Sequence, residues 1–288
     1  MLELRGVSYR YPGYATQVLR DLDLTIADGE IVGLVGANEA GKSTLCLVAS
    51  GLAPASIGGR LTGSLLIDGE PMTGRAPHEL AERVVAGFQD PATQRSGVAA
   101  TVFEEVALGP MNLGLAVAQT VGRTRAALAA LGIEALAERH PSRLSGGQSQ
   151  LVALASLLVM RPRHMVLDEP AARLDPAGTN LVAGAIRALA ATGAGLLIAE
   201  HRTDLLDGLC GRIVVLDGGC VVLDGPAGEV FADDRIEGFG VEPPARIRLA
   251  RALAARGLDP ALIVLDADAT PVRGVASPDP AAAPSAPA

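Results

Sequence analysis

The stretch Gly36-Ala37-Asn38-Glu39-Ala40-Gly41-Lys42-Ser43 decides the fold of this chain of 288 residues. It follows a continuously apolar run, residues 31–35, that is typical of a strand buried on both faces, and it precedes apolar residues with helical spacing. In this setting the pattern G-x-x-x-x-G-K-[ST] predicts a loop whose backbone N–H groups and lysine hold phosphate oxygens. We therefore expect residues 36–44, up to Thr44, to bind the phosphates of a nucleotide, with Ser43 as a ligand of Mg²⁺.

Two residues of this loop stand out. Glu39 occupies a position where relatives of the motif mostly carry glycine, and its carboxylate would repel phosphates if it pointed inward, so we expect it to point outward. Lys42 is the only lysine beside 23 arginines. Because the broad guanidinium plane cannot replace a compact ammonium in a tight loop, this lysine is expected to have a specific role at the phosphates.

The composition favours a folded protein without a general nucleic-acid surface. Hydrophobic residues make up 49% of the chain and aromatic residues 2%, which predicts a core of aliphatic side chains. The net charge of −8 opposes broad binding to nucleic acids. The three cysteines lack paired spacing, which argues against a disulfide framework or a cysteine zinc site and favours a reducing cytoplasm. We expect no signal peptide and no membrane span, since no run reaches roughly 18 apolar residues.

Hydrophobic patterns along the chain predict an α/β fold. Alternation between Leu2 and Asp28, broken at Pro12-Gly13, predicts antiparallel strands, and residues 212–225 predict a hairpin that turns at Gly218-Gly219. Apolar runs at 164–168 and 195–199 alternate with helical segments near 147–160 and 177–191, which indicates parallel strands with crossover helices. Residues 92–143 are rich in Ala and Leu, have no strand run, and predict a helical subdomain.

Two adjacent carboxylates end the apolar run 164–168. Because ligands of α/β sheets bind at the carboxyl ends of parallel strands, Asp168 and Glu169 are expected near the phosphate loop. Asp168 would hold Mg²⁺, directly or through water, and Glu169 would act as general base toward an attacking water. Taken alone, this pattern fits a solvated acidic turn ended by Pro170 about as well.

The motif Leu144-Ser145-Gly146-Gly147-Gln148 adds a second anion site at the start of a helix, or else an ordinary serine helix cap. With this motif the chain resembles the ATP-binding cassette (ABC) family, whose signature is LSGGQ. The resemblance implies a P-loop ABC-ATPase fold with a mixed β-sheet core, an antiparallel β subdomain and a helical signature subdomain. It also implies that two cassettes enclose two ATP molecules head to tail, each signature contacting the γ-phosphate held by the other subunit. A lone chain should then be a poor ATPase.

The resemblance covers about residues 2–232 and assigns further roles. Tyr11 is similar to the aromatic residue that stacks on adenine, although a strand-end tyrosine is the alternative and Tyr9 and Tyr14 are rivals. Gln89 corresponds to the glutamine that contacts Mg²⁺ and water and links the site to the helical subdomain. Three histidines of the chain have no such motif around them and are interpreted as surface or packing residues: His78, His140 and His164.

Two more positions follow from the family pattern. Asp175, in Leu174-Asp175, resembles the D-loop, and His201 resembles the switch histidine that contacts the γ-phosphate. The chain departs from the pattern at Leu151, where the family usually has arginine, and at Arg173, which replaces a common D-loop glycine. Because Glu169, His201 and LSGGQ are intact, hydrolysis of ATP is still expected.

The runs Phe88–Gln94 and Val102–Gly114 resemble the FQNP-x-x-Q and VxEExxxGPxNLG motifs of energy-coupling-factor importers and related cobalt and nickel importers. The implied protein is an importer ATPase for a vitamin or metal ion, at the cytoplasmic face of the cell membrane. Its implied partners are a second ABC ATPase subunit (identical or a sister chain), an integral membrane scaffold protein whose helices seat between the core and residues 92–143, and a substrate-binding membrane subunit, with no nucleic acid. Alternatives are a soluble ABC ATPase acting as a nucleotide switch, or the ATPase of another importer or exporter class.

Three regions are expected along the chain. Residues 1–234 would form the ABC ATPase domain, with its helical subdomain at about 92–160, followed by a C-terminal extension at 235–276 and a disordered Pro/Ala tail at 277–288. The extension contains an arginine-bearing helix near residues 244–256 and a short apolar run at 262–265. That helix fits either a solvated face or, as the resemblance implies, an extra contact between two ATPase subunits.

Overall fold

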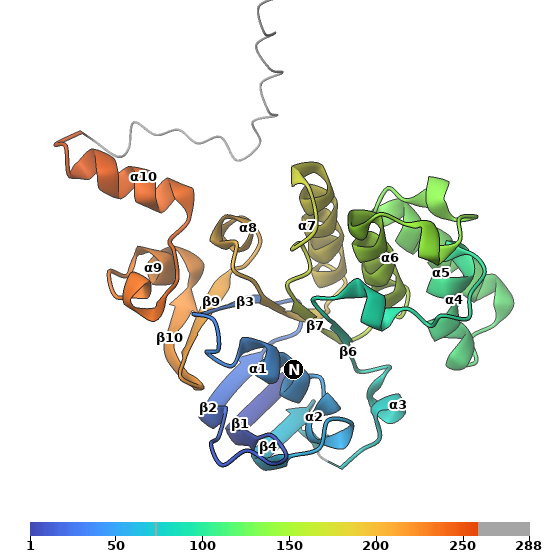
Figure 1. The fold of residues 1–288 in the computed structure, drawn as a ribbon, viewed down its shortest axis with the longest axis horizontal. Helices are drawn as coiled ribbons and strands as arrows, with labels where there is room; N and C mark the ends of the chain where they lie inside the picture. Colours follow the sequence, from blue (N-terminus) through green and yellow to red (C-terminus); the bar gives the residue numbers. More distant parts are fainter. Residues whose placement is uncertain (73, 259–288) are drawn as a thin grey trace, which may run out of the picture. The chain divides into compact units, whose positions relative to one another are not determined.

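The computed structural model describes residues 1–72 and 74–258 (Figure 1). By its internal contacts the chain separates into two compact units, Met1–Ile247 and the residues from Arg248 onward. The sheets and the candidate site belong to the first unit. The domain boundaries expected from the sequence remain predictions, and the apolar run at 262–265 and the tail at 277–288 lie outside the described residues.

A six-stranded sheet carries the site. Its strands lie in the order β10 (Cys220–Pro226), β9 (Arg212–Asp217), β3 (Ile31–Val35), β8 (Gly195–Ala199), β7 (His164–Asp168) and β6 (Val84–Gly87). All are parallel except β10, which pairs with β9 as the predicted hairpin. The pleat of β7 sends Met165 and Leu167 into one hydrophobic cluster and Val166 into another, so both faces of the sheet are covered.

A second, antiparallel sheet has the order β2 (Leu19–Ile26), β1 (Leu2–Arg10), β4 (Arg60–Ile67) and β5 (Glu70–Pro71). The helix α1 (Lys42–Ala49) packs between this sheet and the larger one (Figure 1). Its residues Leu45 and Val48 are fully buried in a cluster that includes side chains of β1, β3 and β8. The antiparallel strands at the N-terminus form as predicted, and the structure adds β4 as the other neighbour of β1.

The helical subdomain forms as expected, with no strand among the described residues between 92 and 163. It contains α4 (Val102–Asn112), α5 (Val117–Ala130) and α6 (Gly146–Leu158), grouped on one side in Figure 1. Short 3₁₀ turns accompany them: η1 (Pro91–Gln94), η2 (Glu134–Leu136) and η3 (Pro141–Arg143). Thr101 starts α4 because its hydroxyl accepts the N–H of Glu104, whose carboxylate accepts the N–H of Thr101 in return.

The remaining helices connect strands or follow the last one. They are α2 (Leu52–Ala55), α3 (Pro77–Leu80), α7 (Pro176–Ala190), α8 (Thr203–Asp207), α9 (Ala227–Ala232), η4 (Ile236–Phe239) and α10 (Ala245–Ala254). The last of these is the predicted arginine-bearing helix, and its role remains a prediction. Within residues 1–72 and 74–258, no helix combines the length and apolar character needed to cross a bilayer.

Candidate nucleotide-binding and catalytic site

The phosphate loop joins β3 to α1, as the sequence predicts. Gly36 must be glycine here, because a Cβ would lie 2.2 Å from the carbonyl oxygen of Leu216. Gly41 precedes α1 in a left-handed conformation (φ 106°) and provides no side-chain cap. The first backbone N–H groups of α1 are thus left without a side-chain acceptor at the end of the helix that attracts anions.

Lys42 begins α1, and its side chain turns back over the loop. Its Nζ donates hydrogen bonds of 2.8 Å to the carbonyl oxygens of Gly36 and Ala37, and only 7% of the residue is exposed. Desolvation lowers the pKa of Lys42, while the nearby carboxylates of Glu169 and Asp168 oppose this shift. In the described part of the chain no carboxylate forms an ion pair with the ammonium, so its charge is available to a phosphate.

Glu39 is exposed, and its outward orientation stays a prediction. Its backbone is in the left-handed region (φ 66°), a conformation that favours glycine. We predict that Glu39→Gly raises the free energy of unfolding by about 1 kcal/mol through relief of this strain. ATP affinity should change by less than about threefold, because an exposed charge is screened by salt.

Thermal unfolding and an ATP titration check this prediction. Asp21→Gly is a matched control, since Asp21 also has a positive φ (45°) but lies in β2, outside the loop. It should gain similar stability with no change in ATP affinity. A gain in ATP affinity of tenfold or more in Glu39→Gly would show that the carboxylate does face the phosphates.

Gln89, Glu169 and His201 come together at the carboxyl edge of the larger sheet. Strands β6, β7 and β8 are neighbours in register, so the residues that follow them emerge side by side. The Nε2 of Gln89 donates a 2.7 Å hydrogen bond to Oε2 of Glu169, and Nε2 of His201 lies 3.2 Å from Oε1 of the same carboxylate. Both oxygens of the predicted general base are therefore engaged by the two other predicted catalytic residues.

The backbone of Glu169 is itself unusual. It has φ 50°, in the left-handed region, and its N–H donates to the carbonyl oxygen of Ala199 at 2.8 Å. A non-glycine residue held in this conformation costs on the order of 1 kcal/mol or more, and such residues cluster at functional sites. In this conformation the carboxylate of Glu169 contacts Gln89 and His201.

Asp168 and Ser43 form the part of the site that suits Mg²⁺. Only 9% of Asp168 is exposed, and desolvation raises the pKa of its carboxyl, although a hydrogen bond from Ser43 acts in the opposite direction. A buried carboxylate beside a hydroxyl offers two hard oxygen donors, and a divalent cation would offset the cost of burying this charge. Gln89, the third predicted ligand, reaches the same strand end through its bond to Glu169.

The three tyrosines differ in burial and in their contacts. Tyr9 is fully buried and donates a 2.7 Å hydrogen bond to the carbonyl oxygen of Gly58, which leaves no free ring face for a base. Tyr11 is partly buried, packs edge to face against Tyr9, and its hydroxyl lies 3.1 Å from Oγ1 of Thr44. Tyr14 is 67% exposed. The contact with Thr44 links Tyr11 directly to the phosphate loop, and its stacking on adenine remains a prediction.

The signature residues lie at the start of α6. The Ser145 hydroxyl accepts the N–H of Gln148 at 3.2 Å, and the Gln148 side chain accepts the N–H of Ser145 at 3.1 Å. The serine is thus an ordinary helix cap in this chain, which was the alternative interpretation. Its hydroxyl hydrogen is still free to be donated to a phosphate, so a role toward a second subunit remains a prediction.

The D-loop packs against the signature. Asp175 caps α7 by accepting the N–H of Gly178 at 2.7 Å. The carbonyl oxygen of Arg173 would lie 3.3 Å from a Cβ added to Gly147, and the Arg173 guanidinium pairs with the carboxylate of Asp90 at 3.5 Å. The departure at Arg173 therefore joins the D-loop to the segment that follows Gln89.

Leu151, the other departure, is 8% exposed and belongs to the hydrophobic cluster formed with β7 and the helices. An arginine there would bury an ionised group, so the leucine fits the apolar packing of this chain.

Glu200 is a residue of the site that the sequence reasoning missed. It follows β8 directly, is 2% exposed, and accepts three backbone N–H groups, from Ala171 at 3.3 Å, His201 at 3.0 Å and Arg202 at 3.3 Å. Desolvation raises the pKa of its carboxyl, and the three hydrogen bonds oppose the shift. The carboxylate joins the histidine loop, which contains His201 and Arg202, to Ala171 in the segment after Glu169. Its signal in the sequence is a charged residue between an apolar strand and His201.

We predict that Glu200→Ala lowers the free energy of unfolding by about 2–4 kcal/mol, because it leaves buried N–H groups unpaired. With His201 less firmly held, kcat for ATP should fall about tenfold while KM stays close to its original value. Glu200→Gln keeps one acceptor oxygen and should recover part of both losses. Denaturant unfolding and steady-state kinetics measure these effects, and an alanine variant with unchanged turnover would exclude the positioning role.

A phosphate loop with its lysine, together with paired carboxylates at a neighbouring strand end, defines a P-loop nucleotide hydrolase. The family model described as ABC transporter matches residues 19–172. A protein of Pyrococcus abyssi (strain GE5 / Orsay), whose name describes an ABC transporter ATP-binding protein, is 38% identical over 260 residues, or 90% of this chain and 92% of that protein. This chain belongs to the ABC transporter family, as an ATP-binding subunit with ATPase activity.

Two further comparisons are informative. The energy-coupling factor transporter ATP-binding protein EcfA2 of Symbiobacterium thermophilum is 37% identical over 279 residues, covering 94% of each chain. The solved structure of cbiO1 from Clostridium perfringens, described as part of the ABC transporter complex cbiONQ, superposes with a TM-score of 0.71 at 30% identity, over 88% of this chain and 94% of that one. ABC ATPases bind ATP or ADP, dimerise and work with membrane components.

Proposed function

We propose that this chain is the ATPase subunit of an energy-coupling-factor type importer for a vitamin or a metal ion, peripheral to the cytoplasmic face of the membrane. The observation that carries the proposal is the likeness to EcfA2 over 94% of both chains. The likeness to cbiO1 supports it. The partners would be a second ABC ATPase, a membrane scaffold and a substrate-binding membrane subunit.

The two sequence runs that resemble this importer group form a connected structure. Gln94 accepts the N–H of Phe88 at 3.2 Å and donates to the carbonyl oxygen of Ala86 at 3.2 Å, which closes the loop that carries Gln89. Glu105, buried in α4, accepts from the N–H of Ser96 at 2.6 Å and from its hydroxyl at 2.8 Å. Through these hydrogen bonds, a movement of the helical subdomain would change the position of Gln89.

The geometry supports a mechanism for ATP hydrolysis. An attacking water would replace one of the two neighbours of Glu169, and the freed carboxylate oxygen would take its proton as the water oxygen attacks the γ-phosphorus and ADP leaves. Lys42 and the N–H groups of α1 would hold the phosphates, and His201 would contact the γ-phosphate. Mg²⁺, held by Ser43 and Asp168 with Gln89, would neutralise charge on the phosphate oxygens when bound.

The contacts of Glu169 fit an enzyme whose single chain has low ATPase activity until a second cassette binds. In this chain both carboxylate oxygens contact protein groups, and Ser145 caps its own helix. Closure of two cassettes would bring the second subunit's signature onto the γ-phosphate and shift Gln89. Differential affinity of the open and closed dimers for ATP would then couple the nucleotide to the membrane partners.

Purification from membranes tests the proposal. The tagged chain, co-expressed with the genes that neighbour its own and extracted in detergent, should retain a polytopic scaffold and a small membrane protein, with a vitamin or metal ion identified by mass spectrometry. The Glu169→Gln variant should retain the same partners, which separates assembly from turnover. Recovery of the chain with ribosomes or nucleic-acid enzymes, and without membrane proteins, would overturn the proposal and favour a soluble ABC switch.

A further inference from the structure

Three ligand-type side chains meet at the edge of the larger sheet opposite to the nucleotide site. Asp28 lies in the turn between β2 and β3, Asp68 in the turn between β4 and β5, and His164 is the first residue of β7. One ligand atom from each lies within 4.8 Å of the others. Since β7 runs from His164 to Asp168, the length of the strand, roughly 13 Å, separates this cluster from the catalytic carboxylates.

The imidazole of His164 is buried without a hydrogen-bond partner, which independently indicates that the cluster binds a ligand. The His164 side chain is 1% exposed, and neither ring nitrogen has a hydrogen-bond partner. Buried polar groups without partners are rare because each costs about 1–3 kcal/mol. Nε2 is aimed at the cluster, 3.8 Å from Oδ1 of Asp28, and Gly195 leaves room for the ring, since a Cβ there would lie 2.7 Å from Nδ1.

The electrostatics suit a cation between the two carboxylates. The ammonium of Met1 lies 2.6 Å from Oδ1 of Asp28 and 2.7 Å from Oδ1 of Asp68, so both oxygens attract a positive group, and a metal ion would take the place of the ammonium. Arg163 occupies Oδ2 of Asp68 and leaves Oδ1 to face the cluster. A neutral imidazole has one ring nitrogen with a lone pair that a metal ion can accept.

We propose that Asp28, Asp68 and His164 form a binding site for a divalent transition-metal ion such as Zn²⁺. One imidazole and two carboxylates are a ligand set for this class of ion, with a water in the fourth position. Bonds of about 2.0–2.2 Å require ligand atoms closer together than 4.8 Å, and Asp28, with 63% of its side chain exposed, can rotate inward.

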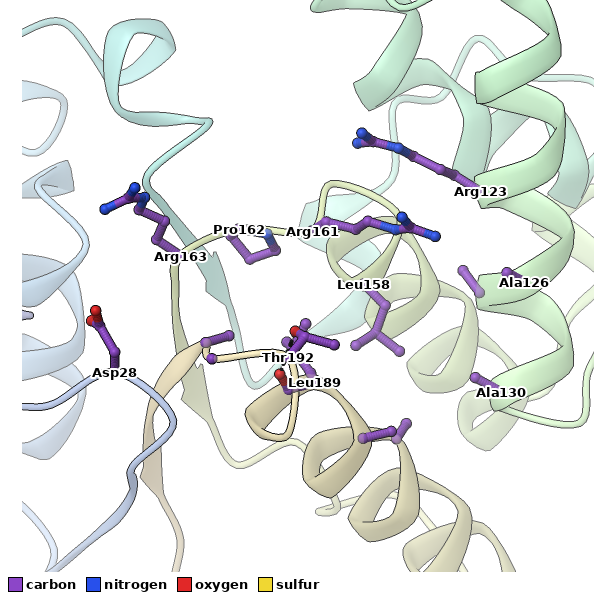
Figure 2. A pocket seen from close by; sticks show the side chains of 15 residues that line it. Asp28, Arg123, Ala126, Ala130, Leu158, Arg161, Pro162, Arg163, Leu189 and Thr192 are labelled. Carbon is purple, nitrogen blue, oxygen red and sulfur yellow. Dashed lines mark hydrogen bonds between the residues drawn. The ribbon is translucent and has the colours of Figure 1, made fainter.

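A cavity lies beside Asp28, and Asp68 and His164 are not among its lining residues. It has a volume of about 800 Å³, and Asp28 and Arg163 belong to its lining (Figure 2). In Figure 2 these two residues lie on one side of the cavity, and Arg123 and Arg161 lie on the other. The bound ion would fasten together the β2–β3 turn, the β4–β5 turn and the start of β7, and so join the two sheets at this edge.

The test uses the full chain, stripped of metal, without nucleotide, and with its tag at the C-terminus so that Met1 is undisturbed. Calorimetry should show one equivalent of Zn²⁺ bound, and Co²⁺ should give a visible absorption spectrum. At about 100 times Kd, Zn²⁺ should raise Tm by roughly 5–10 °C. Mg²⁺ at the same concentration should not reproduce these effects, because it prefers six oxygen ligands.

Variants decide whether these residues bind the ion. Asp28→Asn, at an exposed turn, and His164→Gln should each weaken Zn²⁺ binding at least tenfold and abolish the Co²⁺ spectrum. The control Glu70→Gln removes an exposed carboxylate that pairs with Arg75 and Arg83, and it should bind like the original chain. No zinc binding by the original chain, or unchanged binding by Asp28→Asn, would overturn the proposal.

The Glu169→Gln variant tests whether the nucleotide site is the source of the measured Zn²⁺ binding. The variant should bind Zn²⁺ with unchanged affinity, because its carboxylate lies at the opposite end of β7. Loss of binding in Glu169→Gln would place the ion at the catalytic carboxylates and contradict the site described here. None of these measurements depends on transport or ATP turnover, so the result is independent of the proposed importer function.

Discussion

Glu169→Gln is expected to lower kcat for ATP hydrolysis by about 10²–10⁴-fold, the usual contribution of a general base. The amide cannot accept a proton from water, but it has nearly the same shape as the carboxylate. It removes one negative charge near Lys42 and Asp168, whose pKa values respond to Glu169, so ATP binding should be kept or slightly strengthened. The variant should therefore accumulate as an ATP-bound dimer.

Turnover is measured by phosphate release, and dimerisation by light scattering of the eluting protein with and without ATP. Glu229→Gln is a suitable control, since Glu229 is an exposed glutamate on α9 and should turn over ATP normally. His201→Ala should also lose activity, because it removes the partner 3.2 Å from Oε1 of Glu169. A Glu169→Gln variant with more than a tenth of the original kcat would show that another group takes the proton.

Lys42→Ala and Lys42→Arg are both expected to reduce ATP turnover by more than 10²-fold, on the order of the loss caused by removing one preorganised donor to a transition state. The alanine variant loses the charge. The arginine variant keeps the charge, but its planar guanidinium does not fit where Nζ lies 2.8 Å from two loop carbonyls on a residue that is 93% buried.

Phosphate release and ATP binding should both fall in these variants, whereas Glu169→Gln should lose only the former. Arg125→Lys, at an exposed position of α5, is the matched control for the exchange of lysine and arginine, and should have no effect on either. Near-normal turnover by Lys42→Arg would mean that charge alone suffices at this loop, and the interpretation of the single lysine would be wrong.

Much of the fold follows from local patterns. The apolar runs of β3, β7 and β8, the hairpin of β9 and β10 and the helical subdomain were all predicted, because strands buried on both faces and helices rich in Ala and Leu leave strong periodic signals. The pairing of β4 with β1 gave no such signal, since Gly63 interrupts the strand and only its last residues are buried.

The sequence by itself determined the chemistry of the site, because the phosphate loop, the paired carboxylates and the signature are short motifs in which spacing and residue type carry the function. It could not show that Gln89 and His201 occupy both oxygens of Glu169, or that Glu200 holds the histidine loop. Nor could it show that Asp28, Asp68 and His164 meet. Apart from the bonds of Glu200 to the neighbouring His201 and Arg202, these contacts join residues 29 to 136 positions apart, and only the order and register of the strands bring such distant residues close together.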